Sequence, residues 1–405
     1  MKKYFVIGIV CVLVVGGLVG LAYKQQLDRL AYGLTLFSGA EQYENFNRLA
    51  EIFPTTMMTA AGSPFDFDDG EPISLPATFA YKGGEVNVET FLSETDSSAL
   101  LVIHKGKVRF ERYMLTGGRG VKWLSMSVSK SFIATGIGIA VDEGLIDILK
   151  PITDYVPSLI GSAYDQVRIK DVLQMSSGAA WNEDYSDVES DIMRLGRIMS
   201  VGGSLDEFVG TLTREREPGA YNHYNSADTQ ALAMLLSRAT GMSITDYITD
   251  KLWHPLGMES DAYWLVDDEN VEMAFGGLNA TARDYAKLGE LHRLNGAWQG
   301  KQIVSASWVA AATTPDAPHL LPGVNKDFPL GYGYQWWVPE TSEGEYSAIG
   351  VYNQFIYVNP TRDLVIVKLS AFSDYALSLD ESSYRELETI AFFRAIGRQL
   401  SINLR

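Results

Sequence analysis

Cysteine is almost absent from this chain, because its 405 residues include only Cys11. That residue lies in an apolar N-terminal run, so the remaining chain forms no internal disulfide and depends on a packed core. Histidine is scarce as well, and no pair has His-x-x-x-His spacing or a cysteine pair beside it, which argues against a metal site. The five histidines are His104, His223, His254, His292 and His319. We therefore expect neither a metal nor a cofactor.

Positive charge is also in short supply. The chain has 33 Lys and Arg against 50 Asp and Glu, which gives a formal net charge of -17. This balance argues against a surface that binds nucleic acid. Hydrophobic residues make up 46% and charged residues 20%, as in globular proteins. The length suits one large domain or two ordinary ones. Nothing in the composition identifies a protein partner.

One long uncharged run stands at the N-terminus, from Tyr4 to Tyr23, directly after two lysines. It is long enough to span a bilayer as a transmembrane helix, and the lysines favour an N-terminus inside the cell. The rest of the chain would then be membrane-anchored outside the cytoplasm. A cleavable signal is the alternative, since Gly20-Leu21-Ala22 offers small residues for a peptidase, and the protein would then be secreted. We assign residues 1–23 to this anchor or signal segment.

The body of the chain shows strand patterns at both ends and helix patterns between them. Residues 99–104 and 108–113 predict a hairpin, and strands return at 333–338, 354–358 and 364–369. Helices are predicted over 227–240, 243–253 and 281–294, with a closing helix over 382–400. This order indicates an α+β fold, in which helices flank one antiparallel sheet and an inserted helical lobe spans about 145–295. We expect an N-terminal extension over 24–97 and the main domain over 98–405.

The segment Ser125–Phe132 carries the clearest chemical signal. Ser127 and Lys130 stand three residues apart at the head of an apolar helix, so both side chains share one helix face. A serine hydroxyl is a weak nucleophile and needs a neighbouring base, which the Lys130 amine can supply. The alternative is an ordinary serine at a helix start with a lysine that reaches solvent.

Two further segments fit the same chemistry. Tyr224 precedes an apolar helix, and its hydroxyl can relay a proton if the Lys130 ammonium lowers its pKa. On a late strand, Gly350 lets a substrate approach the backbone, and the N–H groups of Val351 and Ser127 can form an oxyanion hole. Each also has a plain structural interpretation, as a packed turn and as a bulged strand.

These three motifs, in this order, resemble the β-lactamase-like serine hydrolases of the penicillin-recognising superfamily, from about residue 99 to residue 371. Several stretches resemble its 6-aminohexanoate-dimer hydrolase branch, namely Tyr224–Gln230, Leu252–Met258, Phe275–Tyr285 and Gly331–Trp337. The resemblance implies a β-lactamase/transpeptidase-like fold. It also implies that Ser127 is acylated, Lys130 is the base and Tyr224 the proton relay, with Ser127 and Val351 in the oxyanion hole.

Two departures from the superfamily bear on the substrate. Ser226 stands where an asparagine usually contacts a substrate amide, and Ala348 stands where a Lys or His usually faces the substrate carboxylate. The second loss removes a contact worth about 1.5–3 kcal/mol, so we expect weak activity on penicillins and cephalosporins. In the acidic loop 182–187, Tyr185 is the candidate to hold the substrate amide, and the acids suit an amine end. Asn279 is a further candidate for substrate binding, or a helix cap.

The sequence thus predicts a serine hydrolase that cleaves small linear amides or carboxylic esters through an acyl-Ser127 intermediate. Three alternatives remain open. One is a carboxylesterase, the second is a peptidase or carboxypeptidase acting on D-amino residues of cell-wall peptides, and the third is a penicillin-binding-like sensor without catalysis. The same residues serve an amidase and an esterase, so the sequence does not separate these two. The intact set of Ser127, Lys130 and Tyr224 argues against the sensor, which would keep only the fold.

Overall fold

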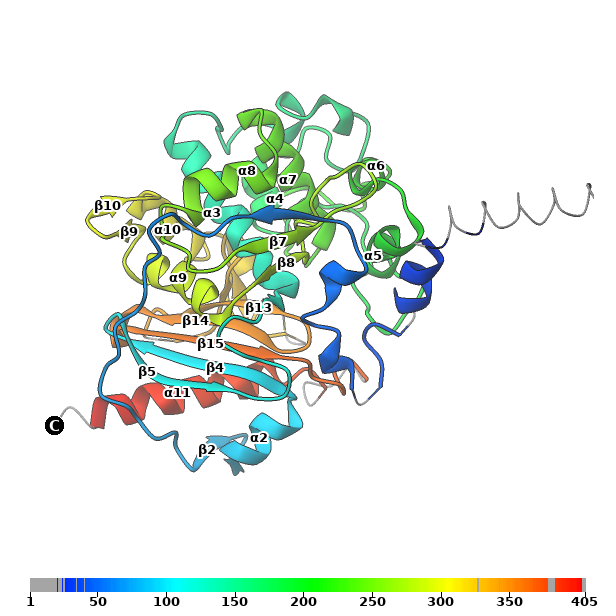
Figure 1. Ribbon diagram of the computed structural model, residues 1–405. Helices are drawn as coiled ribbons and strands as arrows, with labels where there is room; N and C mark the ends of the chain where they lie inside the picture. The colour runs from blue at the N-terminus through cyan, green and yellow to red at the C-terminus, as the bar shows by residue number, and fades with distance from the viewer. Residues whose placement is uncertain are drawn as a thin grey trace, which may run out of the picture.

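An antiparallel sheet lies at the centre of the molecule (Figure 1). The computed structural model describes residues 20, 24, 26–33, 35–39, 41–325, 328–341, 343–377 and 383–402. Across the sheet the strand order is β11 (Gly331–Tyr332), β12 (Trp337–Val338), β13 (Tyr346–Gly350), β14 (Gln354–Asn359), β15 (Leu364–Ser370), β4 (Ser97–His104) and β5 (Lys107–Tyr113). Because β15 pairs with β4, the last strand of the chain completes a sheet that an early strand begins.

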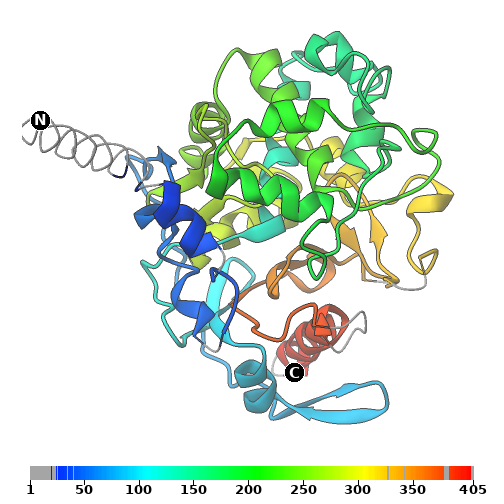
Figure 2. The ribbon, with the colours of Figure 1, turned by 90° about the vertical axis from the view of Figure 1, so that its right-hand side faces the viewer.

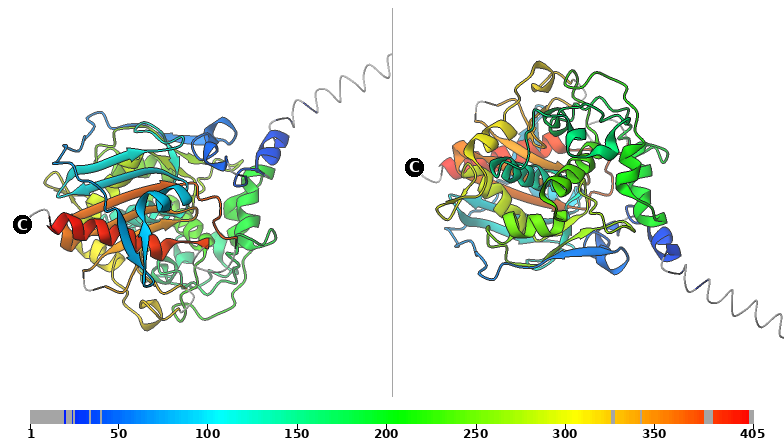
Figure 3. Two further views of the ribbon diagram at one scale, coloured as in Figure 1. Left: turned by 90° about the horizontal axis from the view of Figure 1, so that it is seen from below. Right: turned by 90° about the horizontal axis from the view of Figure 1, so that it is seen from above.

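Both faces of this sheet are covered, and the side chains of β4 show how. Leu101 and Ile103 point into the core beneath the helical lobe, whereas Leu100 and Val102 point into a second core on the opposite face. The alternation is the two-residue period of a strand. Helix α11 (Glu386–Ile402) lies on the second face, together with α2 (Val88–Glu94) and the hairpin of β2 (Thr78–Tyr81) and β3 (Gly84–Asn87) (Figure 3).

Helices α3 (Ser129–Asp142) and α9 (Ala282–Arg293) lie between the sheet and the helical lobe (Figure 1). Helix α9 packs closely on the sheet at Gly289, where a Cβ would lie 2.6 Å from Val365 Cγ1. Further helices of the described residues are α4 (Ile169–Leu173), α5 (Asp191–Val201), α6 (Leu205–Gly210), α7 (Ser226–Thr240), α8 (Ile244–Ile248) and α10 (Ala306–Ala312). Helix α7 is delimited by its sequence, because the Asn225 side chain caps Ala227 N and Gly241 ends it with φ +70°.

The predicted elements are found with small shifts, except at residues 333–338. That segment was expected to be one strand, but the chain turns between β11 and β12. Gln335 has φ +61°, and its buried side chain bonds to Thr229 Oγ1 and the Leu173 carbonyl. These contacts fix Gln335 in the left-handed region and interrupt the strand. The closing helix begins at Glu386 rather than near residue 382.

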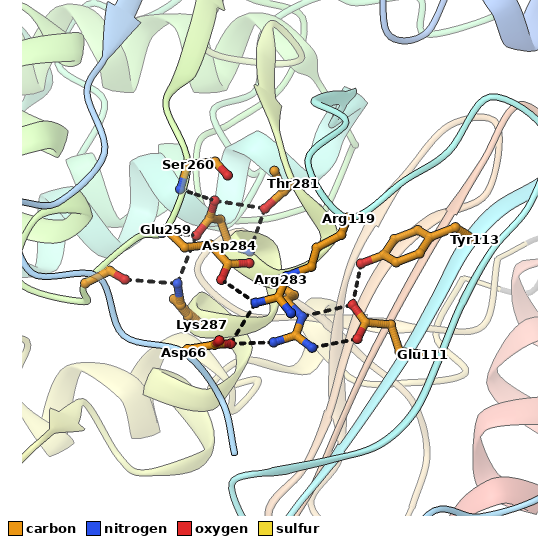
Figure 4. Close-up of polar contacts among 11 residues, drawn as sticks. Asp66, Glu111, Tyr113, Arg119, Glu259, Ser260, Thr281, Arg283, Asp284 and Lys287 are labelled. Atoms are coloured by element: carbon orange, nitrogen blue, oxygen red, sulfur yellow. Dashed lines mark hydrogen bonds and ion pairs between the residues drawn. The ribbon is translucent and has the colours of Figure 1, made fainter. Parts of the chain in front are cut away.

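The N-terminal extension is fastened to the body at several points. Strand β1 (Thr55–Met58) pairs with β7 (Ala262–Leu265), in a small sheet completed by β8 (Leu278–Ala280) and β6 (Trp123–Leu124). Arg283 of α9 donates to Asp66 of the extension at 2.6 Å and to both oxygens of Glu111 on β5 (Figure 4). A further short hairpin, β9 (Ala297–Trp298) with β10 (Lys301–Gln302), follows α9.

Residues 26–33 form a short helix that packs beside α5 (Figure 2). A Cβ on Gly33 would lie 2.4 Å from Ser200 Oγ, and Arg29 donates to Asp268 at 3.2 Å. The structure does not support the transmembrane helix that the sequence predicted, and the expected fold is corrected on this point. Within the described ranges no helix is long and apolar enough to span a bilayer, which takes about 20 apolar residues. Most of the segment 4–23 lies outside the described residues.

Candidate active site

Ser127 lies in the short turn η3 (Met126–Val128) that leads from β6 into helix α3. Met126, the residue before it, has φ +45°, a value that L-residues other than asparagine and aspartate seldom adopt. The Ser125 N–H donates to the Leu278 carbonyl at 2.8 Å and so ties this turn to β8. Such strained backbone persists only where the surroundings fix it, and it is typical of functional sites.

The Lys130 amine lies next to the Ser127 hydroxyl, with 2.9 Å between Nζ and Oγ. It also donates to Ser226 Oγ at 3.1 Å and to the Phe275 carbonyl at 2.7 Å. Lys130 is only 1% exposed. Burial lowers its pKa from the usual 10.5 to about 7, against the opposing field of Glu183. A large share of Lys130 is therefore neutral near pH 7 and able to accept a proton.

Tyr224 completes the trio of polar groups around Ser127. Its hydroxyl lies close to Ser127, and Lys130 Nζ lies 5.3 Å from the centre of its ring. Trp337 stacks on the other side of the ring, with 5.1 Å between centroids. We expected the pKa of Tyr224 to be lowered, but burial and the Glu183 carboxylate raise it. Tyr224 therefore remains a neutral phenol, which can donate a proton but does not act as a tyrosinate.

Glu183 is the residue of this site that the sequence did not single out. Its carboxylate accepts hydrogen bonds from Trp181 Nε1, from Tyr185 OH at 2.8 Å, and from Ser226 N at 3.0 Å and Oγ at 2.7 Å. Ser226 thus bridges Glu183 to Lys130. The sequence placed Glu183 in an acidic loop, 43 residues from Ser226 in the chain, and no local pattern links the two.

The end of strand β13 lies against the Ser127 turn. A Cβ on Gly350 would lie 2.7 Å from the Ser125 carbonyl and 3.0 Å from Ser127 N, so only glycine fits without displacing this backbone. Among the hydrogen bonds of the described residues, neither the Ser127 N–H nor the Val351 N–H has a protein acceptor. Two unpaired N–H donors on adjoining segments are what an oxyanion hole requires.

The other predicted substrate contacts are placed differently. Tyr185 is half-buried, and its hydroxyl donates to Glu183. Asn279 is fully buried, with Nδ2 donating to the Gly277 carbonyl at 3.0 Å. Asp184 accepts from Ser186, and these hydrogen bonds lower the pKa of its carboxyl. Among the described residues, none of these three forms a hydrogen bond or ion pair with Ser127 or Lys130.

The strand position where the superfamily usually has a Lys or His also differs here. Ala348 is buried in β13, and its apolar side chain offers no charge to a substrate carboxylate. In the described part of the chain, no cluster of His, Cys, Asp or Glu side chains is arranged to hold a metal ion. The chemistry that this site can support is acyl transfer to Ser127, with Lys130 as base and Tyr224 as acid.

Comparisons with known proteins show the family of this chain. The Beta-lactamase family model matches residues 87–388. The 6-aminohexanoate-dimer hydrolase of Paenarthrobacter ureafaciens is 33% identical over 339 residues, which cover 81% of this chain and 85% of that protein.

Solved structures show the same fold. A structure from Bacillus anthracis, provisionally assigned as a 6-aminohexanoate-dimer hydrolase, has a TM-score of 0.81 at 21% identity and covers 91% of this chain and 96% of its own. EstCE1, a hydrolase with promiscuous acyltransferase activity, has a TM-score of 0.60 at 15% identity, with coverage of 76% and 96%. The chain therefore belongs to the Beta-lactamase family, in the branch that contains 6-aminohexanoate-dimer hydrolase.

Proposed function

We propose that this protein hydrolyses small linear amides through an acyl-enzyme on Ser127. The observation that supports the proposal most directly is the Lys130 amine, which is buried, has a pKa of about 7 and lies 2.9 Å from Ser127 Oγ. A base with a pKa near the working pH is the most effective one for general-base catalysis. A relative that is 33% identical, a 6-aminohexanoate-dimer hydrolase, suggests a linear amide as the substrate.

In the first half-reaction, neutral Lys130 takes the proton of Ser127 as Oγ attacks the substrate carbonyl carbon. The carbonyl oxygen becomes an oxyanion, and the N–H groups of Ser127 and Val351 donate to it. Tyr224 then protonates the leaving amine as the C–N bond breaks, and the Lys130 ammonium returns a proton to Tyr224. The products of this step are the free amine and acyl-Ser127.

In the second half-reaction a water molecule attacks the acyl carbonyl and loses its proton to Lys130. The bond from the acyl carbon to Ser127 Oγ breaks, and Ser127 regains a proton from the Lys130–Tyr224 pair. The carboxylic acid leaves, and the enzyme returns to its starting protonation state. The same residues hydrolyse a carboxylic ester, whose leaving group needs less assistance from Tyr224.

The test compares wild-type protein with Ser127→Ala and Lys130→Ala on a linear aminohexanoate dimer and on p-nitrophenyl butyrate. Turnover of the dimer that both variants lose would support the amidase. Turnover of the ester alone would favour a carboxylesterase. No turnover of either substrate by the wild type, together with no labelling by a fluorophosphonate, would contradict the enzyme proposal.

Ser131→Ala is the matched control, because Ser131 is also buried in the first turns of α3 but donates to the Gln335 carbonyl, away from Lys130. We expect this variant to keep both turnover and fluorophosphonate labelling. Nitrocefin should be hydrolysed poorly, since Ala348 supplies no partner for its carboxylate.

A further inference from the structure

A cluster of polar side chains is buried directly behind the turn that carries Val351. It consists of Asn353, Gln354, Lys368, Ser370 and Thr389, each of which is 0% exposed. They come from the β13–β14 turn, β14, β15 and α11, within a core that is otherwise lined by Phe91, Phe355 and Phe393. Burying polar groups is costly unless they are hydrogen-bonded, and a network of this size requires a physical reason.

The contacts of the cluster converge on the turn. Lys368 Nζ donates to Asn353 Oδ1 at 2.7 Å and also contacts Ser370 Oγ. Thr389 Oγ1 lies 3.0 Å from the same Asn353 oxygen. Gln354 Nε2 donates to the carbonyls of Val351 and Tyr352, at 3.3 and 3.0 Å. The side chains of the cluster therefore hold three successive residues of the turn.

The turn itself needs such support. Tyr352 and Asn353 have φ values of +61° and +70°; asparagine adopts such values readily, but for the tyrosine they are unfavourable. On the side opposite Lys368, the Tyr352 ring stacks on Phe37 of the N-terminal extension, with 5.0 Å between centroids. The residue before Val351 is Gly350, whose backbone lies against Ser127 N. The turn is thus held from both sides at the point where it meets the nucleophile.

Lys368 is the unusual member of the cluster. No ion pair of Lys368 with a carboxylate is found in the described ranges, and its Nζ lies 5.6 Å from the centre of the Phe91 ring. Burial and the nearby Arg385 lower its pKa well below the usual value. A buried amine that is hydrogen-bonded but has no ion pair adds little to the stability of a fold, and an apolar side chain of the same length can pack as well. Stability alone therefore does not account for a lysine at this position.

We propose that Lys368 is a positioning residue for the oxyanion hole. Its amine holds Asn353 so that the Val351 N–H faces the oxygen of a substrate on Ser127. The inference rests on the proposed function, because an oxyanion hole has a role only if Ser127 is acylated. Loss of an oxyanion donor costs about 10²–10³ in kcat. A donor that is displaced rather than removed should cost less, and we expect a decrease of about tenfold to a hundredfold.

The test replaces Lys368 with Met, which keeps the length of the side chain and removes the amine. We expect Lys368→Met to lower kcat on p-nitrophenyl butyrate with KM nearly unchanged, and to weaken inhibition by an alkyl boronic acid by a similar factor. A boronic acid forms a tetrahedral anion on serine, so its affinity reports the oxyanion contacts. The Tm of the variant should stay the same or rise.

Lys287→Met is the matched control. Lys287 is the same residue type, is also 0% exposed, and donates to Asp284 and to the Gly257 carbonyl rather than to the turn (Figure 4). It should show the opposite signature, with a lower Tm and an unchanged kcat of the folded protein.

A second pair of variants tests the turn directly. Asn353→Asp keeps an acceptor for the Lys368 amine and should retain kcat. Asn353→Gly removes this acceptor and should lower kcat, although glycine tolerates the backbone angle φ +70°.

The outcomes separate the two proposals. Lower kcat and weaker boronic acid binding in Lys368→Met, with Tm maintained, would support the positioning role. An active wild type with unchanged kcat in Lys368→Met would overturn this role and leave the proposed function intact. A decrease in kcat that only follows a loss of folded protein would overturn it as well. A wild type without turnover or fluorophosphonate labelling would overturn both.

Discussion

Glu183→Gln is expected to shift the pH dependence of the reaction to lower pH. The Glu183 carboxylate raises the pKa of Lys130, and Ser226 Oγ bridges the two groups at 2.7 and 3.1 Å. Glutamine fits the same place: its oxygen can accept from Trp181 Nε1 and Ser226 N, and its amide can donate to the hydroxyls of Ser226 and Tyr185. The substitution therefore removes the charge and leaves the packing in place.

The magnitude follows from the distance. The bridge places the carboxylate oxygen no more than about 6 Å from Lys130 Nζ. At an effective dielectric constant of about 20, two unit charges at that distance interact by about 3 kcal/mol, or about two pKa units. Glu183 is half-buried, so solvent reduces this interaction. We expect the pKa of Lys130 to fall below about 7 in the variant, by less than this full interaction.

The sign of the effect on activity is fixed by the role of Lys130. Only the neutral amine accepts the Ser127 proton, so kcat/KM of the wild type should rise with pH through about 7 and then reach a plateau. The pKa of Tyr224 is raised, so its titration should not end the plateau near neutral pH. In Glu183→Gln the rise should occur at lower pH, whatever the height of the plateau.

The assay measures kcat/KM for an uncharged ester across the acidic and neutral range, so that the profile reports groups of the free enzyme. Glu189→Gln is the control, because it is the same substitution on the same loop, at a side chain that is 75% exposed. Its profile should match that of the wild type. A profile of Glu183→Gln that rises at the same pH as the wild type would refute the assignment of this limb to Lys130.

Three further predictions concern the leaving group, the oxyanion hole and the fold. Tyr224→Phe should lower amide turnover by about 10²–10⁴ and p-nitrophenyl ester turnover far less, because p-nitrophenolate leaves without a proton; equal losses would exclude the proton relay. Gly350→Ala should lower kcat by about 10² without unfolding the protein, since the added Cβ would displace Ser127 N. A variant with the same kcat as the wild type would contradict that packing. Arg283→Met should cost about 3 kcal/mol in the free energy of unfolding, because it leaves the largely buried Glu111 carboxylate with only its hydrogen bond from Tyr113. Burial alone would raise the pKa of Glu111, but hydrogen bonds from Arg283 and Tyr113 lower it, so this stability is present above about pH 4.5 and is lost as the pH falls further. Denaturant unfolding of both proteins at neutral and acidic pH measures the loss of stability and its pH dependence. If acid lowered the free energy of unfolding equally in Arg283→Met and in the wild type, the pH dependence would not come from this contact.

Local patterns in the sequence predicted several features that the structure contains. The spacing of Ser127 and Lys130 places both on one helix face whatever surrounds them, because helix geometry is local. The range 227–240 predicted for a helix is likewise local, and α7 ends at Gly241 in the structure. The expected transmembrane helix shows the limit of such reasoning, since the described residues hold no helix of that kind.

Features that depend on distant segments were not accessible in this way. The sequence suggested that Lys130 lowers the pKa of Tyr224, but burial and Glu183 raise it. Residues 333–338 read as one strand, yet the contacts of Gln335 with Thr229 and the Leu173 carbonyl break it into two. Both outcomes depend on which groups are buried together.

The sequence by itself determined the chemistry that is available: a serine with a lysine one helical turn away, a tyrosine before a helix, and a glycine near the end of a late strand. Only the tertiary structure decided how those groups are tuned. It brought Glu183 to Ser226 across 43 residues, and it placed Lys368 behind the turn that follows Gly350. The physical reason is that pKa values and backbone strain depend on burial and on neighbours in space, whereas the reach of one side chain along a helix depends only on local geometry.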